Sequence, residues 1–351
     1  TWGTNKIIID SNGLNYQGNP DTFTVEYTTD GQSVNIVYSD ATKGWIPLED
    51  DVVAEAPVAP PTQRAIFAFG GIDGGVINAS NLVNSSGVIG SDVTGVGTAR
   101  NQLAAAGYGG DKAIFAFGKN SSATRVSMTN LVSNSGVVAS DTTGTSTANQ
   151  SMGAATYGVD KAIFAFGYTG SNTNTRNLVN SSGVMSAAVS GAGSARHDLA
   201  ATGYGTPANG TAIFAYGYTT GSVSVSNLCN NLGVIASDVS GVGTARQTLV
   251  AARYGADKAL FAFGSGPVNT RNLVSNLGVV AADASGAGTA RFYMGAAMYG
   301  GDKAVIAFGT TGSNFLSLKN LVNNSGVVAA DVTGVGTERI QTAASGYGYS
   351  A

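Results

Sequence analysis

The sequence has few charged side chains and almost no cysteine or histidine. Of its 351 residues, 11 % are Asp, Glu, Lys or Arg, and the formal net charge is −3. An ordinary soluble domain carries roughly 25 % charged residues, and a balance this weak argues against nucleic acid or an anionic membrane as a partner. One cysteine, Cys229, excludes an internal disulfide framework and a zinc site built from thiolates. One histidine, His197, excludes every mechanism that needs two imidazoles.

Long apolar runs and helical patterns are also missing. No uncharged stretch of about 18 or more residues is apolar enough to cross a bilayer, so we expect no membrane span. No segment shows a sustained apolar period of 3.6 residues, so helix should be scarce. Hydrophobic residues nevertheless make up 43 % of the chain and recur in short, regular segments. This pattern indicates a folded, β-rich protein with a polar but mostly uncharged surface.

Three short motifs recur six times along the chain, always in the same order. The first is the hexapeptide Ala65–Gly70, which returns at intervals of 45 to 50 residues. The second is Asn-Leu-Val (Asn-Leu-Cys in one copy), which begins at Asn81, Asn130, Asn177, Asn227, Asn272 and Asn320. The third is Tyr-Gly, which begins at Tyr108, Tyr157, Tyr204, Tyr254, Tyr299 and Tyr347. A fixed order over six copies indicates repeats of one supersecondary unit.

Each repeat contains four segments typical of short strands. In the second repeat they are Leu103–Tyr108, Lys112–Phe117, Met128–Val132 and Val137–Ser140. Aromatic and β-branched residues in short runs favour strands, and Gly136 suits a tight hairpin between the last two segments. Four strands in about 48 residues, six times over, predict a six-bladed β-propeller. Alanine-rich first strands would surround the axis, and phenylalanines of the second strands would fill the space between blades.

The repeats resemble those of the kelch family. Arg64–Gly71 resembles the kelch strand that ends in a double glycine, and Thr98–Gly109 resembles the strand that leads into the next kelch unit. The resemblance covers residues 64–351, although only the first repeat keeps both glycines and no Trp lies within the repeats. It implies an all-β fold with a six-bladed kelch-like β-propeller at 64–351.

The two ends of the repeat region complement each other. The region opens at Arg64 with the second strand of a unit and ends with Ile340–Tyr347, which has the pattern of a first strand. We therefore expect the C-terminal strand to close blade one. Such a closure removes the free sheet edges that would otherwise invite aggregation.

Residues 1–50 have a different pattern and predict a small β-rich module of their own. Strands are expected at Lys6–Asp10, Thr22–Tyr27, Ser33–Tyr38 and Gly44–Leu48, with a hairpin signal at Asp30-Gly31. Residues 51–63 contain three of the seven prolines and predict a semi-rigid linker. A β unit of this size buries little surface alone, so we expect it to pack on the propeller, on its own copies or on a scaffold, as an attachment or oligomerisation module.

Part of this module resembles a phage component. Val37–Ile46 is similar to a short β module found in structural proteins of marine tailed phages such as cyanophages, especially tail and fibre proteins. The resemblance implies a location in the virion, with other virion proteins as partners of the N-terminal module. It also implies an oligomer or a place in a large assembly.

One loop of the repeat varies in length. From the last Gly of the first motif to the Asn of the second, the spacing ranges from 8 to 12 positions. Binding usually resides in loops carried by a rigid scaffold. The face that carries these loops is therefore the candidate binding face. Within the loops, Tyr218 and Phe315 are candidates for stacking on sugar rings, with packing of the loops themselves as the alternative.

Five arginines recur just before the first strand and belong to the same face. They are Arg100, Arg196, Arg246, Arg291 and Arg339, with Asn149 in the sixth place. A ring of guanidinium groups could hold a carboxylate or phosphate ligand in bidentate geometry. The alternative is structural pairing with the acids that recur near the fourth strand, Asp92, Asp141, Asp238, Asp283 and Asp331, with Ala188 in the sixth place. Asn149 and Ala188 fall in the same blade, which favours the pairing.

The residues of known propeller chemistries are missing. The copper site of some kelch propellers needs two histidines, and the Ser-x-Asp-x-Gly-x-Thr-Trp boxes of sialidases are absent. His197 is interpreted as a polar surface residue and Cys229 as a small hydrophobic residue in the core. We expect no catalytic site, no metal ion and no cofactor.

These patterns predict a non-enzymatic structural or appendage protein of a virion, such as a tail, fibre or decoration protein. Its propeller face would bind a host glycan, a host protein or another virion protein. The alternatives are a cellular or secreted kelch-like interaction module and a glycan-processing enzyme.

Overall fold

The computed structural model describes residues 6–28, 34–48, 63–144, 146–206 and 210–348. In these residues the regular secondary structure is entirely β-strand, and no helix occurs. The all-β class predicted from the sequence is therefore confirmed. Contacts divide the chain into two compact units, Thr1–Pro60 and Pro61–Ala351.

The first unit consists of two small antiparallel sheets. The four strands are β1 (Ile7–Ile9) with β2 (Val25–Tyr27), and β3 (Ile36–Asp40) with β4 (Gly44–Pro47). Tyr16, Val25 and Tyr27 form its buried core, and the hydroxyl groups of the two tyrosines share a hydrogen bond of 2.7 Å. All four strands predicted here are present, with ends that shift by up to three residues. The hairpin signal at Asp30-Gly31 lies outside the described residues.

The predicted linker, 51–63, lies outside the described residues except for its last residue. Gln63 is buried, its carbonyl oxygen accepts a hydrogen bond from Gly300 N at 2.9 Å, and its side-chain oxygen accepts one from Gly301 N at 3.0 Å. Gln63 therefore packs with the second unit, and the predicted bounds of the linker stay a prediction.

The second unit contains six antiparallel sheets of three or four strands, here called the repeat sheets. Their first strands are β25 (Ala343–Tyr347), β8 (Ala104–Tyr108), β12 (Gly153–Tyr157), β16 (Ala200–Tyr204), β19 (Val250–Tyr254) and β22 (Gly295–Tyr299). Their second strands are β5 (Arg64–Ile72), β9 (Lys112–Ala116), β13 (Lys161–Ala165), β17 (Thr211–Ala215), β20 (Lys258–Gly264) and β23 (Lys303–Ala307). Their third strands are β6 (Gly75–Val83), β11 (Thr129–Val132), β14 (Thr175–Val179), β18 (Ser226–Cys229), β21 (Val268–Val274) and β24 (Lys319–Val322).

The fourth strand of each repeat is mostly not formed, which corrects the prediction of four strands per unit. Among the described residues only β15 (Val189–Ser190) is a strand at this place, and the other segments make isolated bridges such as Val132 to Val138. The Asn of the Asn-Leu-Val motif explains the difference. Its side-chain amide donates to a carbonyl oxygen of the fourth segment in every repeat sheet, as Asn130 does to Ala139 at 3.0 Å. A side chain thus replaces part of the backbone ladder.

The turn before this segment forms as predicted. Gly136 has a φ of 85°, a left-handed conformation that glycine adopts without a steric penalty. The equivalent glycines of the other five repeats have φ between 77° and 83°.

Neighbouring repeat sheets pack through small and aromatic side chains. The first strands are in contact in the order β25, β8, β12, β16, β19 and β22, and β22 is also in contact with β25. Between the second strands, aromatic rings of adjacent sheets lie with their centroids 5.4–5.8 Å apart, as for Phe69 and Phe115. The predicted packing of phenylalanines between neighbouring sheets is present. One short additional pair, β7 (Arg100–Asn101) with β10 (Lys119–Asn120), lies at the start of the variable loop.

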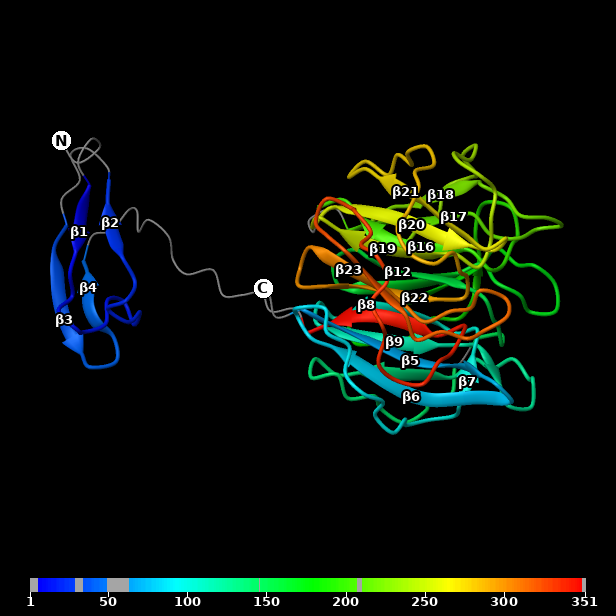
Figure 1. The fold of residues 1–351 in the computed structure, drawn as a ribbon, viewed down its shortest axis with the longest axis horizontal. Helices are drawn as coiled ribbons and strands as arrows, with labels where there is room; N and C mark the ends of the chain where they lie inside the picture. The colour runs from blue at the N-terminus through cyan, green and yellow to red at the C-terminus, as the bar shows by residue number, and fades with distance from the viewer. Residues whose placement is uncertain (1–5, 29–33, 49–62, 145, 207–209, 349–351) are drawn as a thin grey trace. The chain divides into compact units, whose positions relative to one another are not determined.

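The two ends of the repeat region meet in one sheet. The C-terminal strand β25, drawn in red, lies beside β5 in Figure 1, and the two pair antiparallel from Ala343 opposite Ala68 to Tyr347 opposite Arg64. The pairing that the sequence predicts between the last strand and the first repeat is therefore present.

We expect deletion of residues 340–351 to abolish cooperative unfolding and to cause aggregation, because it leaves the edge of β5 unpaired. Thermal unfolding followed by circular dichroism, with light scattering, tests this. Deletion of residues 1–60 is the control and should keep the cooperative transition of the repeat sheets. An unchanged cooperative melt after the C-terminal deletion would contradict the prediction.

Candidate functional site

The five recurrent arginines are buried between repeat sheets. Each is at most 2 % exposed and precedes the first strand of its own sheet. Its Cζ atom lies 4.0–4.7 Å from the centroid of an aromatic ring of the preceding sheet, as Arg100 does above Phe69. The other pairs are Arg196 with Phe166, Arg246 with Tyr216, Arg291 with Phe263 and Arg339 with Phe308. The guanidinium group therefore joins two sheets through a cation–π contact.

Each of these arginines also binds an Asn and an Asp, and four of the five donate through Nε to a backbone carbonyl oxygen; Arg339 Nε instead lies 3.5 Å from Thr342 Oγ1. Arg100 Nε donates to the carbonyl oxygen of Phe117 at 2.8 Å, and Nη2 donates to Asn130 Oδ1 at 2.6 Å. Its Nη1 forms an ion pair with Asp141 at 3.8 Å. We call this set the Arg-Asn-Asp cluster. In the other four clusters the ion pairs are Arg196–Asp238, Arg246–Asp283, Arg291–Asp331 and Arg339–Asp92, at 3.4–3.8 Å.

The carboxylate of each cluster is held from a third side. Asp141 Oδ2 accepts hydrogen bonds from the backbone N and Oγ1 of Thr98, at 2.9 and 2.7 Å. Burial alone would raise the pKa of Asp141, but the hydrogen bonds from Thr98 and Asn130 and the charge of Arg100 hold it below its usual value. Burial lowers the pKa of Arg100 to about 10, against the opposing effect of Asp141. The geometry supports structural pairing, the alternative stated above, because the guanidinium groups have almost no exposed surface for a ligand.

The one repeat without a cluster, which has Asn149 and Ala188, shows why the arginine and the aspartate are replaced together. A Cβ atom on Gly97 would lie 2.5 Å from Asp141 Oδ1, so a side chain cannot follow where the carboxylate is present. The repeat that has Asn149 and Ala188 carries Ser146 at the place of this glycine. The hydroxyl of Ser146 accepts a hydrogen bond from Asn177 Nδ2 at 2.7 Å and takes the place of the missing carboxylate.

Two residues after each arginine position, the backbone forms a closed cycle of hydrogen bonds. The N–H of each residue donates to the carbonyl oxygen of its equivalent in the preceding sheet, at 2.8–3.3 Å. We call these residues the amide ring; they are Gln102, Ser151, Asp198, Thr248, Tyr293 and Gln341. All six have φ between 53° and 61°, a region that non-glycine residues rarely adopt. None of the repeated motifs predicts this ring, and its one signal in the sequence is a polar position between recurrent Arg and recurrent apolar residues.

Tyr218 lies beside the amide ring, on an aromatic row built around His197. The imidazole lies between Tyr168 and Tyr218, with both centroid distances at 5.4 Å. Its Nδ1 is 2.7 Å from Asn172 Oδ1, and its Nε2 is 3.5 Å from Asp198 Oδ2. His197, expected to be a simple surface residue, is half-buried and has both nitrogens near polar partners.

Phe315 lies near a different part of the ring. It pairs with Thr310, which pairs with Phe292, and the ring of Phe292 lies 5.0 Å from that of Tyr293. Tyr218 therefore pairs with the neighbour of a ring residue, whereas Phe315 is linked to the ring only through Thr310 and Phe292, and no contact between Tyr218 and Phe315 is described.

Asp198 is the only acidic residue of the amide ring. Its side chain is 16 % exposed. Burial raises the pKa of Asp198 above its ordinary value, against the opposing effects of the His197 charge and the Ser151 hydroxyl. Burial also raises the pKa of Tyr293, and the negative charge of Asp198 adds to this shift.

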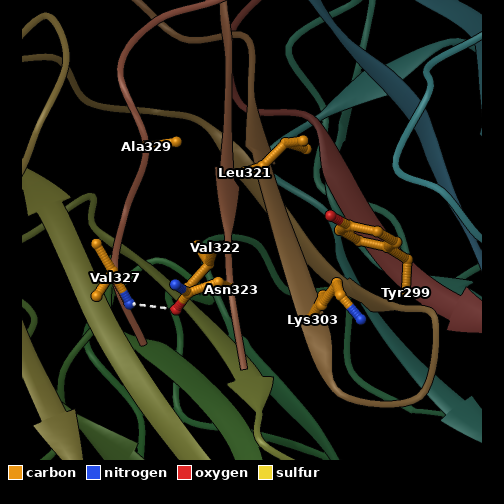
Figure 2. Close-up of a pocket in the computed structure, with 7 residues that line it drawn as sticks. All are labelled: Tyr299, Lys303, Leu321, Val322, Asn323, Val327 and Ala329. Atoms are coloured by element: carbon orange, nitrogen blue, oxygen red, sulfur yellow. Dashed lines mark hydrogen bonds between the residues drawn. The ribbon is translucent and has the colours of Figure 1, made fainter. Parts of the chain in front are cut away.

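Two hollows accompany these features. A cavity of about 110 Å³ lies next to the amide ring. It is lined by the three residues that follow each ring residue along the chain, among them Ala104, Gly153 and Ala200. A pocket of about 230 Å³ lies at the other end of one sheet, between Tyr299, Lys303 and Val327, as Figure 2 shows. Equivalent side chains recur in most other repeats, so this pocket is a feature of the common unit. Nothing in it suggests chemistry, since Lys303 is paired with Asp302 at 2.6 Å.

The remaining searches for known sites and relatives are negative. Within the described residues, no group of three or more His, Cys, Asp or Glu side chains could hold a metal ion. The described part of the chain also has no helix long and apolar enough to cross a membrane. Cys229 is buried, as expected, and burial raises the pKa of its thiol to about 12. No protein-family model matches the chain, and no curated protein matches it in sequence.

We expect Arg100→Met to lower the free energy of unfolding by about 3 kcal/mol, because it leaves Asp141 and Asn130 without their buried partner. Urea unfolding measures the loss. The control is Asn149→Ala at the equivalent position, which removes a hydrogen bond donated to the carbonyl oxygen of Phe166 at 3.0 Å and one accepted from Gln150 N at 2.8 Å, but no ion pair. It should cost about 1–2 kcal/mol. Equal losses in the two variants would contradict a structural role for the ion pair.

We expect Asp198→Asn to stabilise the protein at pH 8. The raised pKa means that the folded protein disfavours the charged form, so the carboxylate costs stability at neutral and alkaline pH. This cost is relieved as the pH falls through the folded pKa, and the difference between the two proteins should vanish below the ordinary pKa of 3.8. Melting temperatures from pH 3 to pH 8 test this, with Asp73→Asn at an exposed acid as control. A destabilised variant at pH 8 would refute the assignment.

Proposed function

We propose that the second unit is a closed six-bladed β-propeller of the kelch-like type. Four observations support the proposal. The six repeat sheets have the same strand order, β22 is in contact with β25 as well as with β19, and the last strand pairs with the first repeat. The cycle of the amide ring passes once through each of the six sheets. A propeller buries both faces of every sheet against its neighbours and leaves only short edges exposed.

The function that we propose for this propeller is binding rather than catalysis. The acids of the Arg-Asn-Asp clusters are committed to structure, and Asp198 is the one acid of the amide ring. A glycosidase needs a second carboxyl group across the scissile bond, and none accompanies Asp198 in the ring. The variable loops and the amide ring lie at the same end of the first strands, since Tyr218 in a loop pairs with His197 next to the ring. This face is the binding face of the proposal.

We further propose that the chain is a structural or appendage protein of a virion, with a host glycan as the ligand of the binding face. The resemblance of Val37–Ile46 to modules of phage tail and fibre proteins supports this location. The first unit would hold the propeller on other virion proteins. Its strand β3 is exposed along all five residues, which fits a role in assembly. The low charge of the chain fits an extracellular particle surface.

A glycan microarray, with release of reducing ends measured in parallel, tests this function on the full chain. We expect binding to a subset of glycans and no turnover. Hydrolysis of a bound oligosaccharide would contradict the non-enzymatic assignment. A chain that binds no arrayed glycan would contradict the assignment of a glycan ligand.

A further inference from the structure

The first strands of the six repeats have nearly the same residues, whereas the amide-ring residues just before these strands differ from repeat to repeat. The three residues that follow the first residue of each first strand are mostly Ala or other small residues. The final residue of each first strand is Tyr in all six cases. In the amide ring, by contrast, five different residue types occupy the six places, although the backbone is the same in each. Packing therefore does not select these side chains.

The backbone of the amide ring would favour glycine. A left-handed conformation is free of strain for glycine and costs other residues of order 1 kcal/mol or more, most for β-branched ones such as Thr248. None of the six residues is glycine, in a chain that contains 50 glycines. All six are polar. One other position keeps non-glycine residues at positive φ in all six repeats, that of Phe69, whose buried aromatic rings pack between sheets. The amide-ring residues are polar and differ in type, so a shared packing role does not explain why they are kept.

The chemistry of the ring matches hydroxyl groups. The closed backbone cycle carries two amides, three hydroxyl groups and one carboxylate. Some of these groups have partners within the protein: Thr248 Oγ1 donates to the carbonyl oxygen of Gln247 at 2.6 Å, and Gln341 Oε1 accepts a hydrogen bond at 2.8 Å. Gln102 Oε1 is buried and has no hydrogen-bond partner in the described residues. Asp198 supplies the only formal charge of the ring itself. The five buried arginines cannot neutralise an anion here, because their charges are paired within the Arg-Asn-Asp clusters. An anionic group would face the carboxylate of Asp198, whereas an uncharged polyol would not.

Aromatic side chains stand beside the ring on two sides. Tyr168 and Tyr218 flank His197 next to Asp198, and Phe292 flanks Tyr293. All five of these residues are half-buried, so part of each ring is accessible. Polar groups that surround a centre, with aromatic surface at the margin, are the usual composition of a small-ligand site.

We propose that the amide ring is the binding site for the uncharged, hydroxyl-rich end of a glycan, with Tyr218 and Phe292 at its margin. The inference rests on the proposed function, because it names the site and the ligand class for the glycan that this function requires. It replaces the anionic ligand that the recurrent arginines suggested in the sequence. The contacts would be hydrogen bonds from the six ring side chains to sugar hydroxyl groups.

The test uses two variants that remove a ring side chain without adding backbone strain, Thr248→Gly and Tyr293→Gly. The full chain and each variant are applied to a microarray of neutral glycans, ending in glucose, mannose or galactose, and of sialylated and sulfated glycans. We expect the unaltered chain to bind neutral glycans and each variant to bind about tenfold more weakly, the loss of about one hydrogen bond. The melting temperature of Thr248→Gly should be unchanged or higher.

Controls separate this inference from the proposed function. Thr248→Ala removes the same hydroxyl and keeps the strain, so it should bind as weakly as Thr248→Gly but melt at a lower temperature. Val279→Thr, at an exposed valine beyond the turn at Gly278, should bind as the unaltered chain does. Neutral glycan binding that is unchanged in both glycine variants would overturn the ring as the site and leave the proposed function intact. Binding confined to acidic glycans would overturn the ligand class. A chain that binds no glycan would overturn both proposals.

Discussion

The structure depends on buried arginines that hold one sheet against the next. A guanidinium group can satisfy several acceptors in fixed directions while its flat face covers an aromatic ring. In each Arg-Asn-Asp cluster these two properties act on different sheets, because the ring belongs to the preceding sheet and the Asn and Asp to the arginine's own. Hydrophobic contacts alone are non-directional, so they do not fix the relative position of two alanine-rich sheets. The clusters supply that position, and one of them links Arg339 to Asp92 across the two ends of the repeat region.

This arrangement explains how a chain with so little charge can be stable. Most of its arginines with a structural role are removed from solvent, where removing one partner of an ion pair destabilises the protein far more than removing one partner of an exposed pair. Each buried arginine needs its aspartate, because a buried guanidinium group without its acid would destabilise the folded state. The repeat with Asn149 shows a different solution at the same place. There the charge is absent on both sides, and Ser146 supplies the acceptor that Asn177 needs. Charge and counter-charge are therefore kept or lost as a unit.

Much of the fold could be predicted from the sequence because the repeated pattern is a packing pattern. The Ala-rich segments, the Ala-Ile-Phe-Ala-Phe-Gly motif and the Asn-Leu-Val motif lie on the first, second and third strands, and the joint loss of Asn149 and Ala188 indicated the ion pairs. The fourth strand was predicted wrongly, because no propensity reveals that the amide of Asn130 and its equivalents replaces a backbone ladder. The amide ring could not be predicted. Positive φ is usually signalled by Gly or Asn, and Thr248 and Tyr293 give no such signal.

The aspartates divide into two groups whose pKa values move in opposite directions. Asp141 and its equivalents accept hydrogen bonds and face a guanidinium charge, so their pKa values lie below the usual value and their charged form stabilises the folded state. That stabilisation is present at neutral pH and is lost as the pH falls through the lowered pKa values. Asp198 is disfavoured in its charged form at the same neutral pH. Asp198 therefore weakens the fold, in a ring with five other strained residues, whereas all the cluster acids strengthen it. Asp198 lies 3.5 Å from His197 Nε2 and, in the described residues, has no guanidinium ion pair like those of the cluster acids, and this separates the amide ring from the scaffold that carries it.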